Sequence, residues 1–121
     1  MKPGQVKPEI QTMNNYYVIE KLTDAMDAFI TGRGDVRSRI KNAYSLMHTL
    51  RESDFPDTLK EDWVWIYGEI TKRGPLLAPN GEVWLGDVDN TMRSIRNITG
   101  QRIARRISKL YWEISKNEKY S

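Results

Sequence analysis

Apolar residues recur every three or four positions over most of the chain, which is the period of an amphipathic α-helix. The first stripe predicts a helix that begins at Asn14 or Asn15, either of which can act as its N-cap. Gly32 and Gly34 are expected to end this helix, because glycine adopts the left-handed C-terminal conformation at low cost. The stripe itself consists of Val18, Leu22, Ala25, Met26, Phe29 and Ile30.

Two further stripes predict a second and a third helix. Asp35 is the expected N-cap of the second helix, which we place as ending near Ser53. The third helix is capped by Asp57 or Thr58 and ends at Gly74, which a proline follows. Their stripes are Val36, Ile40, Ala43, Tyr44, Met47 and Leu50 in the second helix, and Leu59, Trp63, Ile66, Tyr67 and Ile70 in the third.

Residues 76–86 depart from the helical period. An Asn-Gly pair at 80–81 lies between two short apolar runs, which is a strong signal for a β-hairpin. We expect a small hairpin or an ordered loop here. Val83, Trp84 and Leu85 should pack partly on the helices, with Trp84 as a plug.

The remaining C-terminal residues predict a fourth and a fifth helix. Asp87 or Asp89 caps the fourth helix, and the phase of the apolar positions changes near Thr99-Gly100, where we expect a break. The alternative is one continuous helix through Gly100, which costs about 1 kcal/mol relative to alanine. The apolar positions are Met92, Ile95 and Ile98 in the fourth helix, and Ile103, Ile107, Leu110, Tyr111 and Ile114 in the fifth.

These elements together predict an all-α fold, a compact bundle of about five helices with one short β-hairpin or ordered loop between helices three and four. A length of 121 residues suits one domain. We place this helical domain at residues 14–118, after a flexible N-terminal arm at residues 1–13 that contains two prolines and a glycine.

Several classes of protein are disfavoured by the composition. Apolar runs are far shorter than the roughly 20 residues that cross a bilayer, so we expect no membrane span. The first residues lack the apolar stretch of a signal peptide, and cysteine is absent, so we expect a cytoplasmic protein without disulfides. His48 is the only histidine and lies at the margin of an apolar stripe, so we expect neither a metal site nor a catalytic histidine.

Charge is distributed unevenly along the chain. Residues 91–121 contain eight Lys/Arg and two acids, whereas the other ninety contain eleven bases and fourteen acids. A net charge of +6 on the C-terminal segment therefore opposes −3 on the rest. A basic helical segment of this kind can attract phosphate backbones or acidic protein surfaces.

The fifth helix separates this charge from its apolar side. A helical wheel places its basic residues away from the isoleucines, with Trp112 beside them. A tryptophan among guanidinium groups can stack on a nucleic-acid base or anchor a protein interface. The predicted nucleic-acid or partner-binding residues are Arg93, Arg96, Arg102, Arg105, Arg106, Lys109 and Trp112.

The third helix offers a second candidate interface. Trp65 lies opposite its apolar stripe, with Glu61, Asp62 and Glu69 at helical spacing around it. This acidic face can dock on the basic fifth helix, within one chain or between two chains. An ordinary solvated basic face, with arginine stems covering apolar edges, remains a further alternative.

Helices four and five have the order of a helix–turn–helix motif, but the residues do not fit it. If Gly100 were the turn glycine, the crowded position four residues earlier should be small, and Arg96 occupies it. A basic helix can still follow a phosphate backbone without this motif.

The function that we expect is non-catalytic binding or regulation through the basic, Trp-flanked C-terminal helix, with nucleic acid as one partner. The alternative is a protein–protein interaction module that uses Trp65 and Trp112, such as an adaptor, an inhibitor, a small complex subunit or a homodimer. No arrangement of residues indicates an enzyme, a cofactor or a small-molecule ligand.

Overall fold

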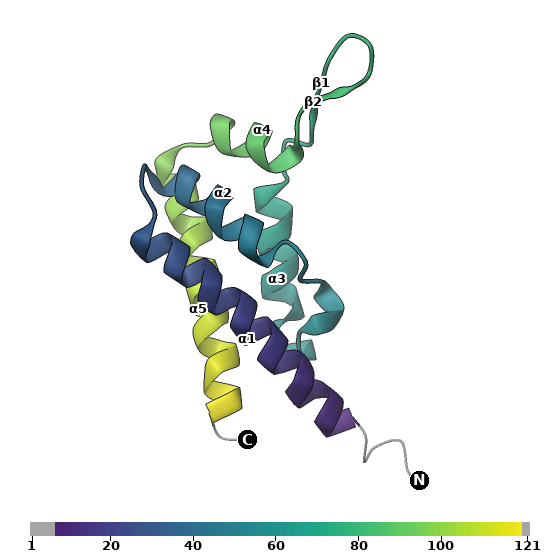
Figure 1. The fold of residues 1–121 in the computed structure, drawn as a ribbon, viewed down its shortest axis with the longest axis vertical. Helices are drawn as coiled ribbons and strands as arrows, with labels where there is room; N and C mark the ends of the chain where they lie inside the picture. The colour runs from purple at the N-terminus through teal and green to yellow at the C-terminus, as the bar shows by residue number, and fades with distance from the viewer. Residues whose placement is uncertain (1–6, 120–121) are drawn as a thin grey trace.

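Helices dominate the structure, a computed structural model that describes the backbone of residues 7–119 and the side chains of residues 15–116. Four long helices pack together, and α4 lies across one end of them (Figure 1). The all-α prediction is confirmed, including the hairpin between the third and fourth helices. In chain order the elements are α1 (Lys7–Thr31), α2 (Val36–Met47), the 3-10 turn η2 (Glu52–Asp54), α3 (Asp57–Ile70), β1 (Leu76–Leu77), β2 (Val83–Leu85), α4 (Asp87–Ser94) and α5 (Asn97–Lys119).

The core forms where the apolar stripes of the four long helices meet. Burial of these stripes is the main stabilising contribution, because each helix is apolar on one side only. Trp63 adds an aromatic centre, stacked on Phe55 with ring centroids 5.3 Å apart. The core side chains of the long helices are Val18, Leu22, Ala25, Ile40, Ala43, Met47, Leu59, Trp63, Ile66, Ile70, Ile103, Ile107, Leu110 and Ile114. Among the helices of the described range, none is long and apolar enough to span a bilayer.

The first helix begins earlier than the sequence predicted. α1 starts at Lys7, so Asn14 and Asn15 lie inside it instead of capping it, and residues 7–13 of the predicted arm are helical. Pro8 is compatible with this start, because the first turn of a helix has no intrahelical acceptors for its N–H groups. The rest of the predicted arm, residues 1–6, lies outside the described residues.

The junction between α1 and α2 follows the prediction. Gly34 has a φ of +87°, a conformation that favours glycine. Asp35 caps α2, because its Oδ1 accepts hydrogen bonds from the backbone nitrogens of Arg37 at 2.9 Å and Ser38 at 3.3 Å. The other end of α2 lies at Met47, before the predicted end near Ser53, and η2 fills the interval.

α3 starts at the predicted place with a different cap. Its N-cap is Pro56, which makes no side-chain hydrogen bond, while Asp57 is the first helical residue. Asp57 instead places a negative charge in the first turn, where the helix dipole favours it.

The break between the last two helices was predicted at the wrong residue. α4 ends at Ser94, and α5 begins at Asn97 and continues through Gly100. Gly100 is buried where α5 crosses α2, and a Cβ atom there would lie 2.8 Å from Cγ1 of Val36. The glycine therefore permits a close approach of two helices instead of ending one.

The hairpin forms as predicted but does not pack as predicted. Gly81 has a φ of +88° in the turn, and Asn80 Oδ1 accepts a hydrogen bond from the backbone nitrogen of Glu82 at 3.0 Å. The two strands project beyond the end of the helices (Figure 1). Trp84 is consequently 73% exposed and Val83 63% exposed, so the expected plug is wrong, while Leu85 is half-buried.

Candidate functional site

α5 presents an open basic surface, because its apolar residues occupy a single stripe. Ile103, Ile107 and Leu110 are buried against the other helices. The residues on the opposite side are exposed, and Trp112 among them is 60% exposed. We call this surface the α5 outer face, and it consists of Arg102, Arg105, Lys109 and Trp112.

Arg106 is not part of this open surface. Its Nε donates a hydrogen bond to Asp62 Oδ1 at 2.7 Å, and its guanidinium lies 4.7 Å from the ring centroid of Trp65. Asp62 is largely buried, with 13% of its side chain exposed. The sequence allowed the acidic third helix to dock on the basic fifth helix. In the structure, the Arg106–Asp62 pair is the one salt bridge that joins the described side chains of these two helices. Trp65 is half-buried and packs against the core, so its predicted outward position is wrong.

The other acids of the predicted second interface do not cover the α5 outer face. Glu61 is exposed. Glu69 Oε2 lies 3.9 Å from Nζ of Lys72, three residues further along the chain. Within the described side chains, no acid lies within salt-bridge distance of Arg102, Arg105 or Lys109. These three cations are therefore exposed, and none of them forms a salt bridge with a described side chain.

Arg93 and Arg96 lie near the α4–α5 junction. Both are exposed, and Arg93 Nε donates to Asn90 Oδ1 at 3.1 Å. Arg96 and Ile98 line one hollow of about 550 Å³, and Ile98 also lines a second hollow of about 230 Å³ with Arg102 and Arg105. Ile98 thus connects Arg96 to the α5 outer face.

The sequence reasoning missed Ile98 as a surface residue. It was assigned to the apolar stripe of the fourth helix, yet it is 61% exposed. Because α5 already includes Ile98, this residue stands four positions before Arg102 on the same side of the helix. Placing the helix break between Ser94 and Asn97 would have assigned Ile98 to the exposed side of α5.

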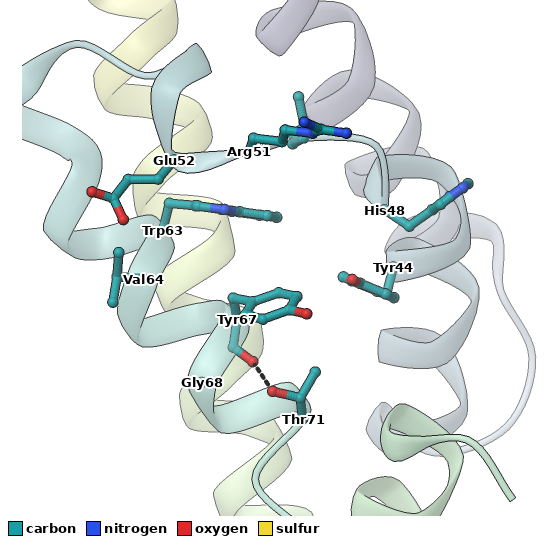
Figure 2. Close-up of a pocket in the computed structure, with 10 residues that line it drawn as sticks. Tyr44, His48, Arg51, Glu52, Trp63, Val64, Tyr67, Gly68 and Thr71 are labelled. Carbon is teal, nitrogen blue, oxygen red and sulfur yellow. Dashed lines mark hydrogen bonds between the residues drawn. The ribbon is translucent and has the colours of Figure 1, made fainter. Parts of the chain in front are cut away.

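A second feature, absent from the sequence reasoning, is a hollow of about 600 Å³ between α2 and α3. Figure 2 shows Trp63 and Tyr67 of α3 reaching toward Tyr44 of α2, with Arg51 along the rim between the two helices. Ring centroids are 6.5 Å apart for Tyr44 and Tyr67, and 6.4 Å for Trp63 and Tyr67. We call this the α2–α3 pocket, defined by Tyr44, His48, Arg51, Trp63, Tyr67 and Gly68.

Two polar side chains of the α2–α3 pocket have defined states. Burial raises the pKa of Tyr44 above its usual 10.0, helped by the charges of Tyr67 and Asp87, so its hydroxyl is protonated and can donate at neutral pH. His48 Nδ1 lies 2.9 Å from the Ser45 carbonyl oxygen, which can only accept, so Nδ1 carries a proton. His48 is exposed at the edge of α2, consistent with its boundary position in the sequence.

Within the described part of the chain, no three or more His, Cys, Asp or Glu residues lie together in a group that could hold a metal ion.

Comparisons with known protein families, with curated proteins and with solved structures found no significant match to this chain.

Proposed function

We propose that this protein is a non-catalytic binding protein of the cytoplasm that contacts single-stranded nucleic acid through the α5 outer face. The observation that carries the proposal is the combination of three exposed, uncompensated cations with a 60% exposed tryptophan on one side of a single helix. Basic grooves interrupted by aromatic rings are typical of proteins that bind single strands.

The spacing of the cations suits a phosphate backbone. Arg102 and Lys109 are seven residues apart on α5, which corresponds to about 10 Å at 1.5 Å per residue. The three cations Arg102, Arg105 and Lys109 can contact up to three phosphates of a flexible single strand, one for each cation. Arg96, joined through Ile98, extends the basic surface beyond the start of α5.

Trp112 favours a single strand over a duplex. Stacking on an indole requires a base whose face is free, and bases inside a duplex are already stacked. The ring of Trp112 packs against Tyr111 in an edge-on arrangement with centroids 5.4 Å apart, which restricts its orientation. A restricted ring loses less conformational entropy when it binds a base.

The test is fluorescence anisotropy of a labelled single-stranded oligonucleotide, titrated with protein at several salt concentrations. Contacts to three phosphates predict a slope of about −2 in a plot of log affinity against log salt. Arg105→Gln should lower the magnitude of this slope by about 0.7, and Trp112→Ala should weaken binding by about 1–3 kcal/mol. Absence of binding to single-stranded DNA and RNA at low salt would refute the proposal.

A second candidate function is protein binding through the same face. Ile98 and Trp112 are both about three-fifths exposed, at 61% and 60%, and they flank the cations. Apolar and aromatic anchors beside arginine are typical of interface hot spots. In this case the partner would be an adaptor target or a second copy of the chain, and Trp65 would contribute nothing directly because Arg106 covers it.

Light scattering separates self-association from the first proposal. A homodimer predicts a molar mass that rises with protein concentration and returns to the monomer value in Trp112→Ala. A monomer at all concentrations that still binds the oligonucleotide supports nucleic acid as the partner.

A further inference from the structure

The α2–α3 pocket has the dimensions and the lining of a small-molecule site. Its volume of about 600 Å³ lies within the usual range for ligand pockets, roughly 300–1,000 Å³. Three aromatic rings, Tyr44, Trp63 and Tyr67, supply apolar surface from two different helices (Figure 2). Tyr67 is 45% exposed and Tyr44 is half-buried, whereas Trp63 is 3% exposed, so the two tyrosines offer most of the aromatic surface that is open to a ligand.

Gly68 is an independent indication that this space is kept open. It lies inside α3 as an exposed residue that lines the pocket, and glycine lowers helix stability there relative to alanine. Its φ is not positive, and a Cβ atom at this position would meet no heavy atom within 4 Å. Neither the backbone conformation nor the packing of the described residues therefore requires a glycine here.

The polar groups of the pocket indicate the charge of its ligand. Arg51 stands at the rim, and no carboxylate of the described residues lies within salt-bridge distance of its guanidinium. Glu52, the one acid that lines the pocket, directs its carboxylate to the side of Trp63 that faces away from Tyr44 (Figure 2). An anionic group on a ligand can therefore pair with Arg51.

We propose that the α2–α3 pocket binds a small planar aromatic anion, such as an aromatic carboxylate. The aromatic part lies against Tyr67 and Tyr44, and the anionic group lies at the rim near Arg51. This site uses α2, η2 and α3 and is separate from the α5 outer face, so it does not depend on the function proposed above.

The test uses two fluorescent probes of nearly the same shape, the anionic anilinonaphthalene sulfonate and its uncharged analogue phenylnaphthylamine. Wild-type protein should bind one anionic probe per chain, with backbone amide shifts in an NMR spectrum confined to α2, η2 and α3. Gly68→Leu should place a bulky side chain in the wall of the pocket and weaken both probes about tenfold or more. Because leucine is a better helix former than glycine, this variant should remain folded, which thermal unfolding checks.

Arg51→Gln tests the charge. It should weaken the anionic probe by about fivefold and leave the uncharged probe unchanged, as expected for one partly exposed ion pair. Arg33→Gln, at an exposed arginine that lines neither the α2–α3 pocket nor the α5 outer face, is the matched control and should change neither probe. The pocket assignment is overturned if folded Gly68→Leu binds both probes like the wild type. The assignment of an anion is overturned if Arg51→Gln affects the two probes equally, or if Arg33→Gln weakens the anionic probe as strongly.

Discussion

Arg106 on α5 and Asp62 on α3 form an ion pair in which Nε and Oδ1 are 2.7 Å apart. Trp65 covers the guanidinium from the other side at 4.7 Å. One arginine of the basic helix therefore links two helices, while its sequence neighbour Arg105 is exposed to solvent. The two residues have the same chemistry and opposite environments, which makes them a matched pair for mutagenesis.

Arg106→Gln should lower the free energy of unfolding by about 1–2 kcal/mol, because it leaves the largely buried Asp62 carboxylate without its charged donor. Arg105→Gln should change stability by less than about 0.5 kcal/mol. Chemical denaturation followed by circular dichroism measures both values. Nucleic-acid affinity should respond in the opposite order, with the larger loss in Arg105→Gln. Equal losses of stability in the two variants would contradict this assignment.

Gly100 and Gly68 are both helical, and alanine should have opposite effects at the two positions. At Gly100 a Cβ atom would stand 2.8 Å from Cγ1 of Val36, so Gly100→Ala should destabilise the protein by about 1–3 kcal/mol. At Gly68 the space is open, so Gly68→Ala should stabilise it by up to about 1 kcal/mol. Thermal and chemical denaturation provide the measurement.

The double variant Val36→Ala/Gly100→Ala is the control for the Gly100 prediction. Removing the Val36 methyl groups opens room for the new Cβ atom, so the double variant should lose less stability than the sum of the two single variants. Additive losses would show that Gly100 is required for another reason.

The positions of the helices could be predicted because their core residues follow a local rule. Val18, Leu22 and Ala25 were assigned to a stripe by spacing alone, and all three are buried. The spacing shows which side of a helix faces the core, but it does not show how far around the helix burial extends. Ile30 was assigned to the same stripe and is 77% exposed, whereas its neighbour Phe29 packs against the core, because Ile30 stands at the edge of the stripe.

The remaining errors concern contacts between segments that are distant in sequence. Gly100 was interpreted as a helix break because glycine often ends helices. Its actual role is to allow close packing against Val36, which is on another helix and distant in sequence. Trp65 lies off the apolar stripe of α3 by its spacing, yet it is half-buried because α5 covers it with Arg106. The α2–α3 pocket is likewise formed by two helices and a turn. A periodic pattern describes each helix by itself and contains no information about which neighbour covers its second face.

The exposed hairpin leads to a contrast between two tryptophans. Trp84 is 73% exposed, so Trp84→Ser should change the free energy of unfolding by less than about 0.5 kcal/mol. Trp63 is 3% exposed and stacks on Phe55, so Trp63→Ala should cost about 3–5 kcal/mol. Urea denaturation of both variants checks the pair. A loss above about 1 kcal/mol in Trp84→Ser would indicate that the hairpin packs on the helices after all.

The cap of α2 predicts a specific dependence of stability on pH. The hydrogen bond from the Arg37 side chain, followed by that from the Ser38 backbone, lowers the pKa of Asp35 below its ordinary 3.8. A carboxylate whose pKa is lower in the folded state stabilises the fold above the unfolded value. This contribution is lost as the pH falls through the lower, folded value.

Asp35→Asn isolates the effect, because the amide oxygen can still accept from the helix N-terminus while the ion pair with Arg37 is lost. The difference in unfolding free energy between wild type and Asp35→Asn should be constant above about pH 5 and should shrink at lower pH, below the ordinary Asp35 pKa of 3.8. Asp24→Asn, at an exposed position of α1 without a salt-bridge partner among the described residues, is the control. A difference that stays constant down to acidic pH, or that grows there, would show that Asp35 is not stabilised as a carboxylate.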